Sequence, residues 1–170
     1  TYLALLVHFR SVLLPLKAIV INILSITASY GAVVVIFQEG NFSEWLGFTP
    51  MGFIEASIPI LMFCVLFGLS MDYEVFLLSR MREVWDIGGN NREAVRTGLA
   101  KSGRIITGAA LIVVVVTASF VTAEVVLIKA LGLGIAIAVA LDATIVRSLV
   151  VPATMRLFGQ WNWWLPQSLE

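Results

Sequence analysis

The acidic residues that could do chemistry lie inside apolar sequence. In FGLSMDYEVFLLSR, residues 67–80, Asp72, Tyr73 and Glu74 follow one another between apolar neighbours. Asp142 lies in a second apolar stretch, VALDATIVRSLVVPA. A charged side chain at the centre of a bilayer costs roughly 2.5–3.5 kcal/mol, so such residues usually point toward protein or water and often have a function. We therefore expect both aspartates to face a protein interior or a hydrated path.

The chemistry that suits Asp72 is proton transfer. Withdrawal from water disfavours the charged form of a carboxyl group, which can then bind a proton on one side of a membrane and release it on the other when its surroundings change. Tyr73 carries a hydroxyl that both donates and accepts hydrogen bonds, and we expect it to meet a polar group on another helix. The alternative for Asp72 is a structural hydrogen bond between helices.

The other polar residues support more than one interpretation. Asp142 could take part in proton movement, or serve packing or a hinge. Thr144 can hydrogen-bond back to its own helix, and Arg147, five residues after Asp142, is expected to lie off the same α-helical face. Glu74 is expected on the side of its helix opposite Asp72, where it either reaches the membrane interface or pairs with Arg147.

The composition is that of a membrane protein. The chain has 170 residues, of which 59% are hydrophobic and 13% charged, and its mean hydropathy is +0.97. Lysine plus arginine and aspartate plus glutamate balance at 11 each, so the charge indicates no nucleic-acid partner. Cys64 is the single cysteine, which excludes an internal disulfide and a cysteine metal site. We predict no metal or other cofactor, and expect Cys64 and His8 simply to pack.

Four stretches are long and apolar enough to cross a bilayer, which takes about 20 residues each. They are residues 18–38, 57–79, 105–123 and 130–151. Residues 1–9, TYLALLVHF, are too short to span and are predicted to end an earlier helix that reaches the surface near Arg10 and turns at Pro15. The predicted fold is an all-α polytopic membrane helix bundle with four complete spans and a partial one at the amino end. The chain is expected to be a piece of something larger.

Positive charge is concentrated on one side of these spans. Residues 39–56, between the first two spans, contain three glutamates and neither lysine nor arginine. The connection between the second and third spans carries Arg80, Arg82, Arg92, Arg96, Lys101 and Arg104. Loops rich in lysine and arginine stay in the cytoplasm, so this connection is predicted to be cytoplasmic. Lys129, offset by Glu124 in the turn after the third span, is expected on the outer side.

Two segments are predicted to lie at the cytoplasmic membrane surface. Residues 86–104 are expected to form a short interfacial helix, which begins with an Asn90 and Glu93 pair that resembles a capping box. A solvated connector is the alternative for this segment. WNWWLP, residues 161–166, is expected to anchor the end of the chain, because tryptophan concentrates at membrane interfaces.

Small residues predict close helix packing in two places. Gly68 lies one turn before Asp72. The fourth span carries a stripe of small residues: Gly132, Gly134, Ala136, Ala138 and Ala140. Small side chains let helix backbones approach closely, which would keep lipid away from the buried acids.

Taken together, these segments resemble a known family. GLSMDYEVFLLSRMREVW, EAVRTGLAKSGRIITGAALI, ALGLGIAIAVALDATIVRSLVVPATM and NWWLP are similar to the carboxy-terminal transmembrane half of MMPL-type transporters, which belong to the resistance-nodulation-division superfamily. The resemblance covers residues 1–170 as one transmembrane domain fragment, the last five of twelve spans. It implies a proton-driven exporter of lipids or other hydrophobic compounds, located in the inner or plasma membrane of the cell.

The resemblance also implies roles for particular residues. Asp72 and Tyr73 would be half of an intramembrane proton relay, and the other half would come from an amino-terminal half that this chain lacks. Gly68, Leu69 and Phe76 would line the pocket around this pair. The implied partners are a lipid or hydrophobic substrate, the bilayer, protons and the amino-terminal half.

Two other functions fit the sequence less well. An intramembrane aspartyl protease would need a YD pair and a GxGD motif on antiparallel helices, whereas this chain has DY and LSMD, and its two aspartates are predicted on parallel helices. Transport rather than catalysis is therefore expected. A non-transporting module of the sterol-sensing kind is the other alternative, and the intramembrane Asp72 argues against it.

Overall fold

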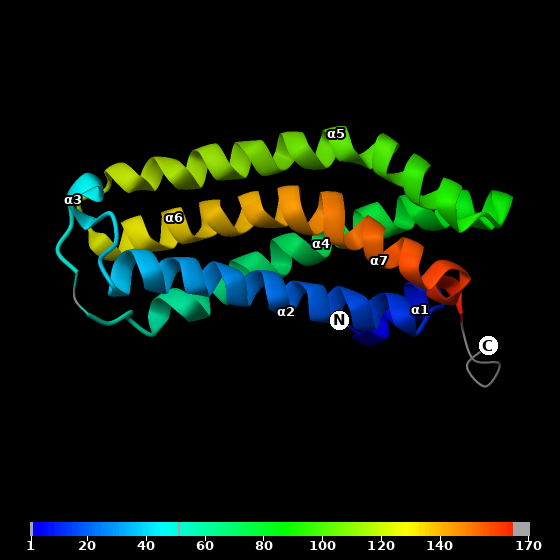
Figure 1. Ribbon diagram of the computed structural model, residues 1–170, viewed down its shortest axis with the longest axis horizontal. Coiled ribbons are helices and arrows are strands. Elements are labelled where there is room, and N and C mark those ends of the chain that lie inside the picture. The colour runs from blue at the N-terminus through cyan, green and yellow to red at the C-terminus, as the bar shows by residue number, and fades with distance from the viewer. Residues whose placement is uncertain (1, 51, 165–170) are drawn as a thin grey trace.

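Long helices run side by side along one axis in the computed structural model, which describes residues 2–50 and 52–164 (Figure 1). The α-helices are α1 (Tyr2–Phe9), α2 (Leu13–Val33), α3 (Ser43–Leu46), α4 (Ser57–Gly88), α5 (Asn91–Ala118), α6 (Val126–Leu141) and α7 (Val151–Phe158). Two segments are π-helical, η1 (Val34–Gln38) and η3 (Asp142–Val150), and two are 3₁₀-helical, η2 (Ser119–Thr122) and η4 (Gly159–Trp163). No strand forms in the described ranges. The all-α prediction is confirmed.

Four continuous helical segments are long and apolar enough to cross a membrane, as predicted. They are Leu13–Gln38, Ser57–Gly88, Asn91–Thr122 and Val126–Trp163. With a rise of about 1.5 Å per residue, the 32 residues of α4 extend over roughly 48 Å. The hydrocarbon core of a bilayer is about 30 Å thick. α4 is therefore longer than the hydrocarbon core is thick, and the predicted bounds of the membrane spans within these helices stay a prediction.

The separate interfacial helix expected over residues 86–104 does not form. α4 continues to Gly88, and α5 begins at Asn91 and is unbroken to Ala118. The apolar face of the first part of α5 packs on α4: Ala94 and Val95 are buried, and Gly98 lies against Met81. This face is thus covered by protein, so it has no reason to lie on the membrane surface.

The turn between α4 and α5 is made by two residues. Gly89 adopts a φ of +60°, a left-handed conformation that glycine reaches without steric cost. Asn90 then caps α5, because its side-chain oxygen accepts hydrogen bonds from the backbone N–H groups of Arg92 at 3.0 Å and Glu93 at 3.3 Å. The Asn90 half of the expected capping box is confirmed. Among the described hydrogen bonds, the Glu93 side chain does not return one to Asn90.

The chain turns at Arg10 rather than at Pro15. α1 ends at Phe9, Arg10 adopts a φ of +44°, and α2 begins at Leu13. Pro15 lies in the first turn of α2, where backbone N–H groups have no partner within the helix, so a proline costs no hydrogen bond there. The expected turn at Pro15 was therefore wrong, and Pro15 belongs to the start of a helix.

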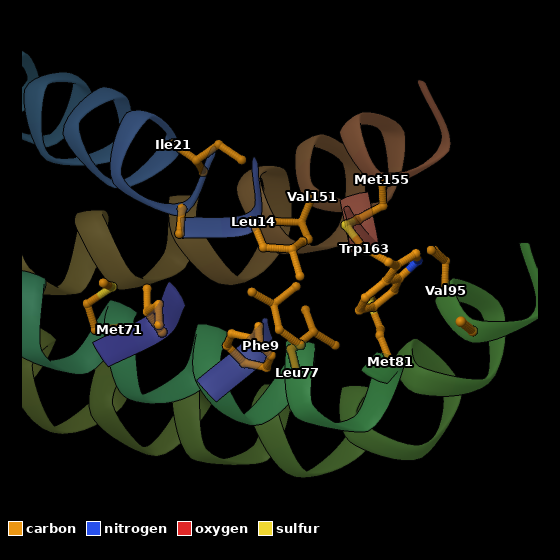
Figure 2. Close-up of a cluster of buried hydrophobic side chains, with 14 of the residues drawn as sticks. Phe9, Leu14, Ile21, Met71, Leu77, Met81, Val95, Val151, Met155 and Trp163 are labelled. Atoms are coloured by element: carbon orange, nitrogen blue, oxygen red, sulfur yellow. The ribbon is translucent and has the colours of Figure 1, made fainter. Parts of the chain in front are cut away.

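A hydrophobic cluster joins the two ends of the described chain. Figure 2 shows Phe9, Leu14, Leu77, Met81 and Trp163 pointing toward one another from α1, α2, α4 and η4. The ring of Trp163 stacks on Trp85, with centroids 5.4 Å apart. This cluster lies at the end of the bundle where η4 and the α4–α5 turn are found (Figure 1).

A network of hydrogen bonds centred on Asn162 lies beside this cluster. Asn162 is fully buried, and its side-chain NH₂ donates to the carbonyl oxygens of Met155 at 2.7 Å and Gly159 at 2.6 Å. Its side-chain oxygen accepts from Lys17, and its backbone carbonyl accepts from the Ser11 hydroxyl at 2.6 Å. The start of α2 is thereby tied to η4.

The tryptophan segment is divided between interior and surface. Trp163 is buried in the cluster, whereas Trp161 and Trp164 are 64% and 47% exposed. Residues 165 and 166 of the predicted anchor lie outside the described residues. The exposed pair is typical of a membrane interface, while Trp163 packs in the core.

The small-residue stripe of α6 packs closely, as predicted. Gly132 lies against Phe120 and the backbone of Thr117, and Gly134 lies against Val33 and Met62. Ala136 and Ala138 are buried as well, and Ala140 is partly buried. Gly68 differs, because it is exposed and an added Cβ would meet no atom within 4 Å. In this chain Gly68 does not bring two helices together.

Lys129 is an interior residue rather than a charge in an outer loop. It is 6% exposed, and its Nζ donates to the carbonyl oxygens of Leu46 at 2.6 Å and Gly47 at 3.5 Å. These carbonyls end α3, where a positive charge is favourable. Glu124 is exposed and does not pair with Lys129. Lys129 thus belongs to α6, and the expectation that it lies in the turn after the third span was wrong.

The close packing of Gly132 predicts a loss of stability in Gly132→Ala. The new Cβ would lie 2.7 Å from the carbonyl oxygen of Thr117 and against Phe120, and overpacking of this kind costs about 1–3 kcal/mol. Gly108→Ala is the matched control, because nothing lies within 4 Å of its position. Thermal unfolding of the full-length protein in detergent should show a lower midpoint for the first variant and an equal or higher one for the second. Equal midpoints for both would contradict the close approach.

Candidate functional site

Asp72 lies on a face of α4 that the described chain leaves uncovered. We call this face the outer stripe; its residues recur about one helical turn apart, and all are exposed: Leu61, Cys64, Val65, Gly68 and Asp72. The expected burial of Asp72 is therefore not found within this chain. Cys64, which was expected to pack, lies in the same stripe, and His8 is exposed too, with its ring edge against Phe9.

Tyr73 lies between the outer stripe and the interior. It is partly buried, and its ring lies 4.7 Å from the guanidinium carbon of Arg147, a cation–π contact. Tyr73 also lines a cavity of about 20 Å³ together with Asn22, Ser70 and Asp142. The polar group that it meets on another helical element is thus Arg147, and the contact is made by the ring.

Asp142 and Arg147 form an ion pair inside the bundle. Arg147 Nη2 bonds Asp142 Oδ2, and the side chains are 6% and 13% exposed respectively. Residues five positions apart lie on different faces of an α-helix, so Arg147 was expected to lie off the face that carries Asp142. Residues 142–150 are π-helical, however, and π-helices bond residue i to residue i+5. The wider turn brings the two side chains to the same side, so that expectation was wrong.

Glu74 is the second acid of the interior. It is 8% exposed, and it lines a cavity of about 10 Å³ with Ser70, Asp142 and Arg147. It therefore does not reach the membrane interface. Glu74 faces the same cavity as Arg147, but the ion pair of Arg147 within the described residues is made with Asp142. The Nη1 atom of Arg147 is buried without a hydrogen-bond partner in the described part of the chain.

Asn22 and Ser70 complete this interior group and were missed in the sequence. Asn22 is 1% exposed; its side-chain oxygen accepts a hydrogen bond from Ser70, and its NH₂ contacts the sulfur of Met71 at 3.1 Å. Ser70 Oγ also lies 3.5 Å from Asp142 Oδ1. The signal was present, because a lone asparagine in an apolar span is a polar residue that must find a partner. We call Asn22, Ser70, Glu74, Asp142 and Arg147 the interior polar cluster.

The remaining expected site residues are dispersed. Thr144 hydrogen-bonds back to the carbonyl of Ala140 at 2.5 Å, as expected, and is exposed. Leu69 lines the same cavity as Tyr73. Phe76 is partly buried, with the guanidinium of Arg80 5.6 Å from its ring, and Gly68 is exposed. Of the three residues expected to share a pocket, Leu69 is the one that lines this cavity, and the shared pocket stays a prediction.

The interior polar cluster is suited to holding a proton and water. The cluster contains two carboxyl groups and one guanidinium, so it is electrically neutral when one carboxyl group carries a proton. A cavity of about 20 Å³ has room for about one water molecule, which needs two to four polar partners. Asn22, Ser70 and Asp142 supply such partners. The described residues contain no group of three histidine, cysteine or acidic side chains that could hold a metal ion.

The buried ion pair predicts a stability pattern for two variants. Arg147→Met should lower the stability of the full-length protein by about 3 kcal/mol, because it leaves Asp142 in the interior without its partner. The double variant Arg147→Met with Asp142→Leu removes both charges and should lose less than the single variant. Thermal unfolding in detergent measures both. A double variant that loses as much stability as Arg147→Met, or more, would contradict the pairing.

Comparison with known proteins identifies the family of this chain. It matches the family model described as "MMPL family" over residues 2–169. It is 46% identical over 169 residues to the "Mycolic acid-containing lipids exporter MmpL11" of Mycolicibacterium smegmatis, with 99% of this chain and 18% of that protein aligned. It is 45% identical over 167 residues to the "Trehalose monomycolate exporter MmpL3" of Mycobacterium tuberculosis, with 98% of this chain and 18% of that protein aligned.

A third relative carries a different name. The chain is 45% identical over 168 residues to the "Heme uptake protein MmpL11" of Mycobacterium tuberculosis, with 99% of this chain and 17% of that protein aligned. The chain thus spans less than a fifth of the length of these relatives. With a family match over nearly its whole length and four membrane-spanning helices, the chain belongs to the MMPL family.

Proposed function

We propose that this chain is the carboxy-terminal transmembrane part of a transporter that uses the proton gradient to export lipids or other hydrophobic compounds across the inner or plasma membrane. Two of the three relatives described above are named as exporters of lipids. The third is named for heme uptake, and heme is hydrophobic too. The observation that carries the proposal is an ionisable residue, Asp72, on an uncovered face of a membrane-spanning helix.

The outer stripe indicates a protein partner within the membrane. If Asp72 faced hydrocarbon, its charge would cost roughly 2.5–3.5 kcal/mol. The stripe also carries Gly68, whose missing side chain leaves room for another backbone to approach. A second half of the same transporter, packed on the stripe, would shield Asp72 from lipid. This chain is less than a fifth of the length of its relatives, so the relatives have ample sequence for such a half.

The groups behind Asp72 connect the outer stripe to the interior polar cluster. Tyr73 follows Asp72 on α4 and contacts Arg147 with its ring. Arg147 pairs with Asp142, and Asp142 adjoins Ser70 and Glu74 around the two small cavities. A proton gained or lost at Asp72 changes the charge at the surface between the two halves. Such a change favours one conformation of the transporter over another, which is how a proton gradient can drive a cycle.

The arrangement supports transport over the two alternatives. An aspartyl protease needs two aspartates that face each other, whereas Asp142 is paired with Arg147 inside the bundle and Asp72 lies on the exposed face of α4. A sterol-sensing module that does not transport would have no use for an ionisable residue on the outer stripe. The names of the relatives also favour transport.

The proposal predicts the effect of Asp72→Asn on proton flux. The full-length protein is reconstituted in liposomes that contain a pH-sensitive dye, and a pH gradient is imposed. Asparagine keeps the shape of aspartate, but its amide does not bind a proton as a carboxylate does. Proton flux should therefore fall to the level of liposomes without protein.

Cys64→Ser is the matched control, because Cys64 lies on the same outer stripe two turns away. It should leave the flux within about twofold of the unaltered protein, and both variants should be expressed at equal levels. Unchanged flux in Asp72→Asn would rule out Asp72 as part of the relay.

A further inference from the structure

An arginine-lined hollow opens where the start of α5 meets α7. Its volume is about 540 Å³, and its lining residues are Asn90, Arg92, Glu93, Arg96, Thr97 and Arg156. We call it the arginine hollow. Its three guanidinium groups come from two separate elements, and none of them takes part in an ion pair within the described residues. Against them stands a single acid, Glu93, so the hollow has a net charge of two positives.

The walls of this hollow are held in place by neighbouring residues. Asn91 lies between Asn90 and Arg92, and its NH₂ donates to the carbonyl of Met155 at 2.8 Å. The side-chain oxygen of Asn91 accepts a hydrogen bond from the indole N–H of Trp163 at 3.0 Å. Arg156 follows Met155 directly, so these bonds fix the distance between the arginines of α5 and the arginine of α7. The backbone positions that carry these arginines are therefore set before any ligand binds.

The surroundings place the hollow at the level of lipid headgroups. Trp161 and Trp164, which flank the Trp163 that bonds Asn91, are exposed, and exposed tryptophans concentrate at membrane interfaces. Leu157 and Phe158, next to Arg156 on α7, are 82% and 42% exposed and offer an apolar surface beside the charges. The basic residues at this end of the bundle assign it to the cytoplasmic side.

We propose that the arginine hollow binds the phosphate-bearing headgroup of an anionic phospholipid from the cytoplasmic leaflet. Arginine forms paired hydrogen bonds with phosphate oxygens through its planar guanidinium group. The amino end of the 28-residue helix α5 adds its favourable dipole to the same place. A free phosphate compound would satisfy the charges but would leave Leu157 and Phe158 in contact with water, whereas acyl chains would cover them. This site is independent of the proton relay proposed above.

The test is a binding titration of phosphatidylglycerol to the purified full-length protein in neutral detergent micelles, with bound lipid counted by native mass spectrometry. Such micelles have no anionic surface, so general attraction to a membrane is removed. An ion pair between an exposed arginine and a lipid phosphate contributes up to about fivefold in affinity. Arg156→Gln should therefore weaken binding about fivefold, and Arg92→Gln with Arg96→Gln about 25-fold.

Glu93→Gln should have the opposite effect and strengthen binding about fivefold. The cap of α5 uses the backbone N–H of Glu93, so the variant keeps it. A gain in affinity cannot result from misfolding. Lys101→Gln with Arg104→Gln is the matched control, because it removes two exposed charges from α5 outside the hollow, and it should change binding by less than twofold.

Three results would overturn the proposal. Phosphatidylcholine could bind as tightly as phosphatidylglycerol, which would remove the role of charge. Inorganic phosphate at millimolar concentration could displace the lipid, which would assign the hollow to a soluble phosphate compound. The control pair could weaken binding as much as the Arg92 and Arg96 pair, which would show attraction along the helix rather than a built site.

Discussion

A charge inside a membrane domain must find an opposite charge or water, and this constraint organises the interior of the bundle. Arg147 satisfies it by pairing with Asp142, and the chain widens into a π-helix to bring the two side chains together. Asn22, Ser70 and Glu74 then gather around the pair and its two small cavities. A packed apolar core in the same place would be easier to build, so the polar groups indicate a purpose beyond stability.

The two faces of α4 carry different groups of residues. The inner face contributes Ser70 and Glu74 to the interior polar cluster, and Leu77 and Met81 to the hydrophobic core. The outer stripe presents Asp72 to whatever covers it. Tyr73 is the link between the faces, since it follows Asp72 in the chain and contacts Arg147 in the interior. A single helix thereby connects the uncovered outer stripe with the interior polar cluster.

Hydropathy, helix caps and small residues made much of this fold predictable. The four spans, the cap at Asn90 and the close packing of Gly132 and Gly134 follow from local patterns. The lengths of α4 and α5 did not follow from such patterns, because their arginine-rich ends have the low hydropathy of a loop. Their apolar residues, such as Val95, pack on a neighbouring helix, and that contact is not visible in one segment alone.

The candidate site was less predictable than the fold. Asp72 and Asp142 were conspicuous because acids are rare in apolar spans, and Tyr73 because it follows Asp72. The π-helix that joins Asp142 to Arg147 has no residue signature, so spacing in an α-helix placed Arg147 on the wrong side. The arginine hollow depends on Arg156 meeting α5, a contact between residues about 60 positions apart.

The π-helical segment at residues 142–150 also sets how α7, which follows it, is rotated about the helix axis. α6, the π-helical segment and α7 form one continuous helix, and one residue more or less before α7 rotates it by about 100°. If residues 142–150 were α-helical instead, Arg156 would point away from Arg92 and Arg96. The backbone conformation of residues 142–150 thus determines both the pairing of Asp142 with Arg147 and the position of Arg156 in the arginine hollow.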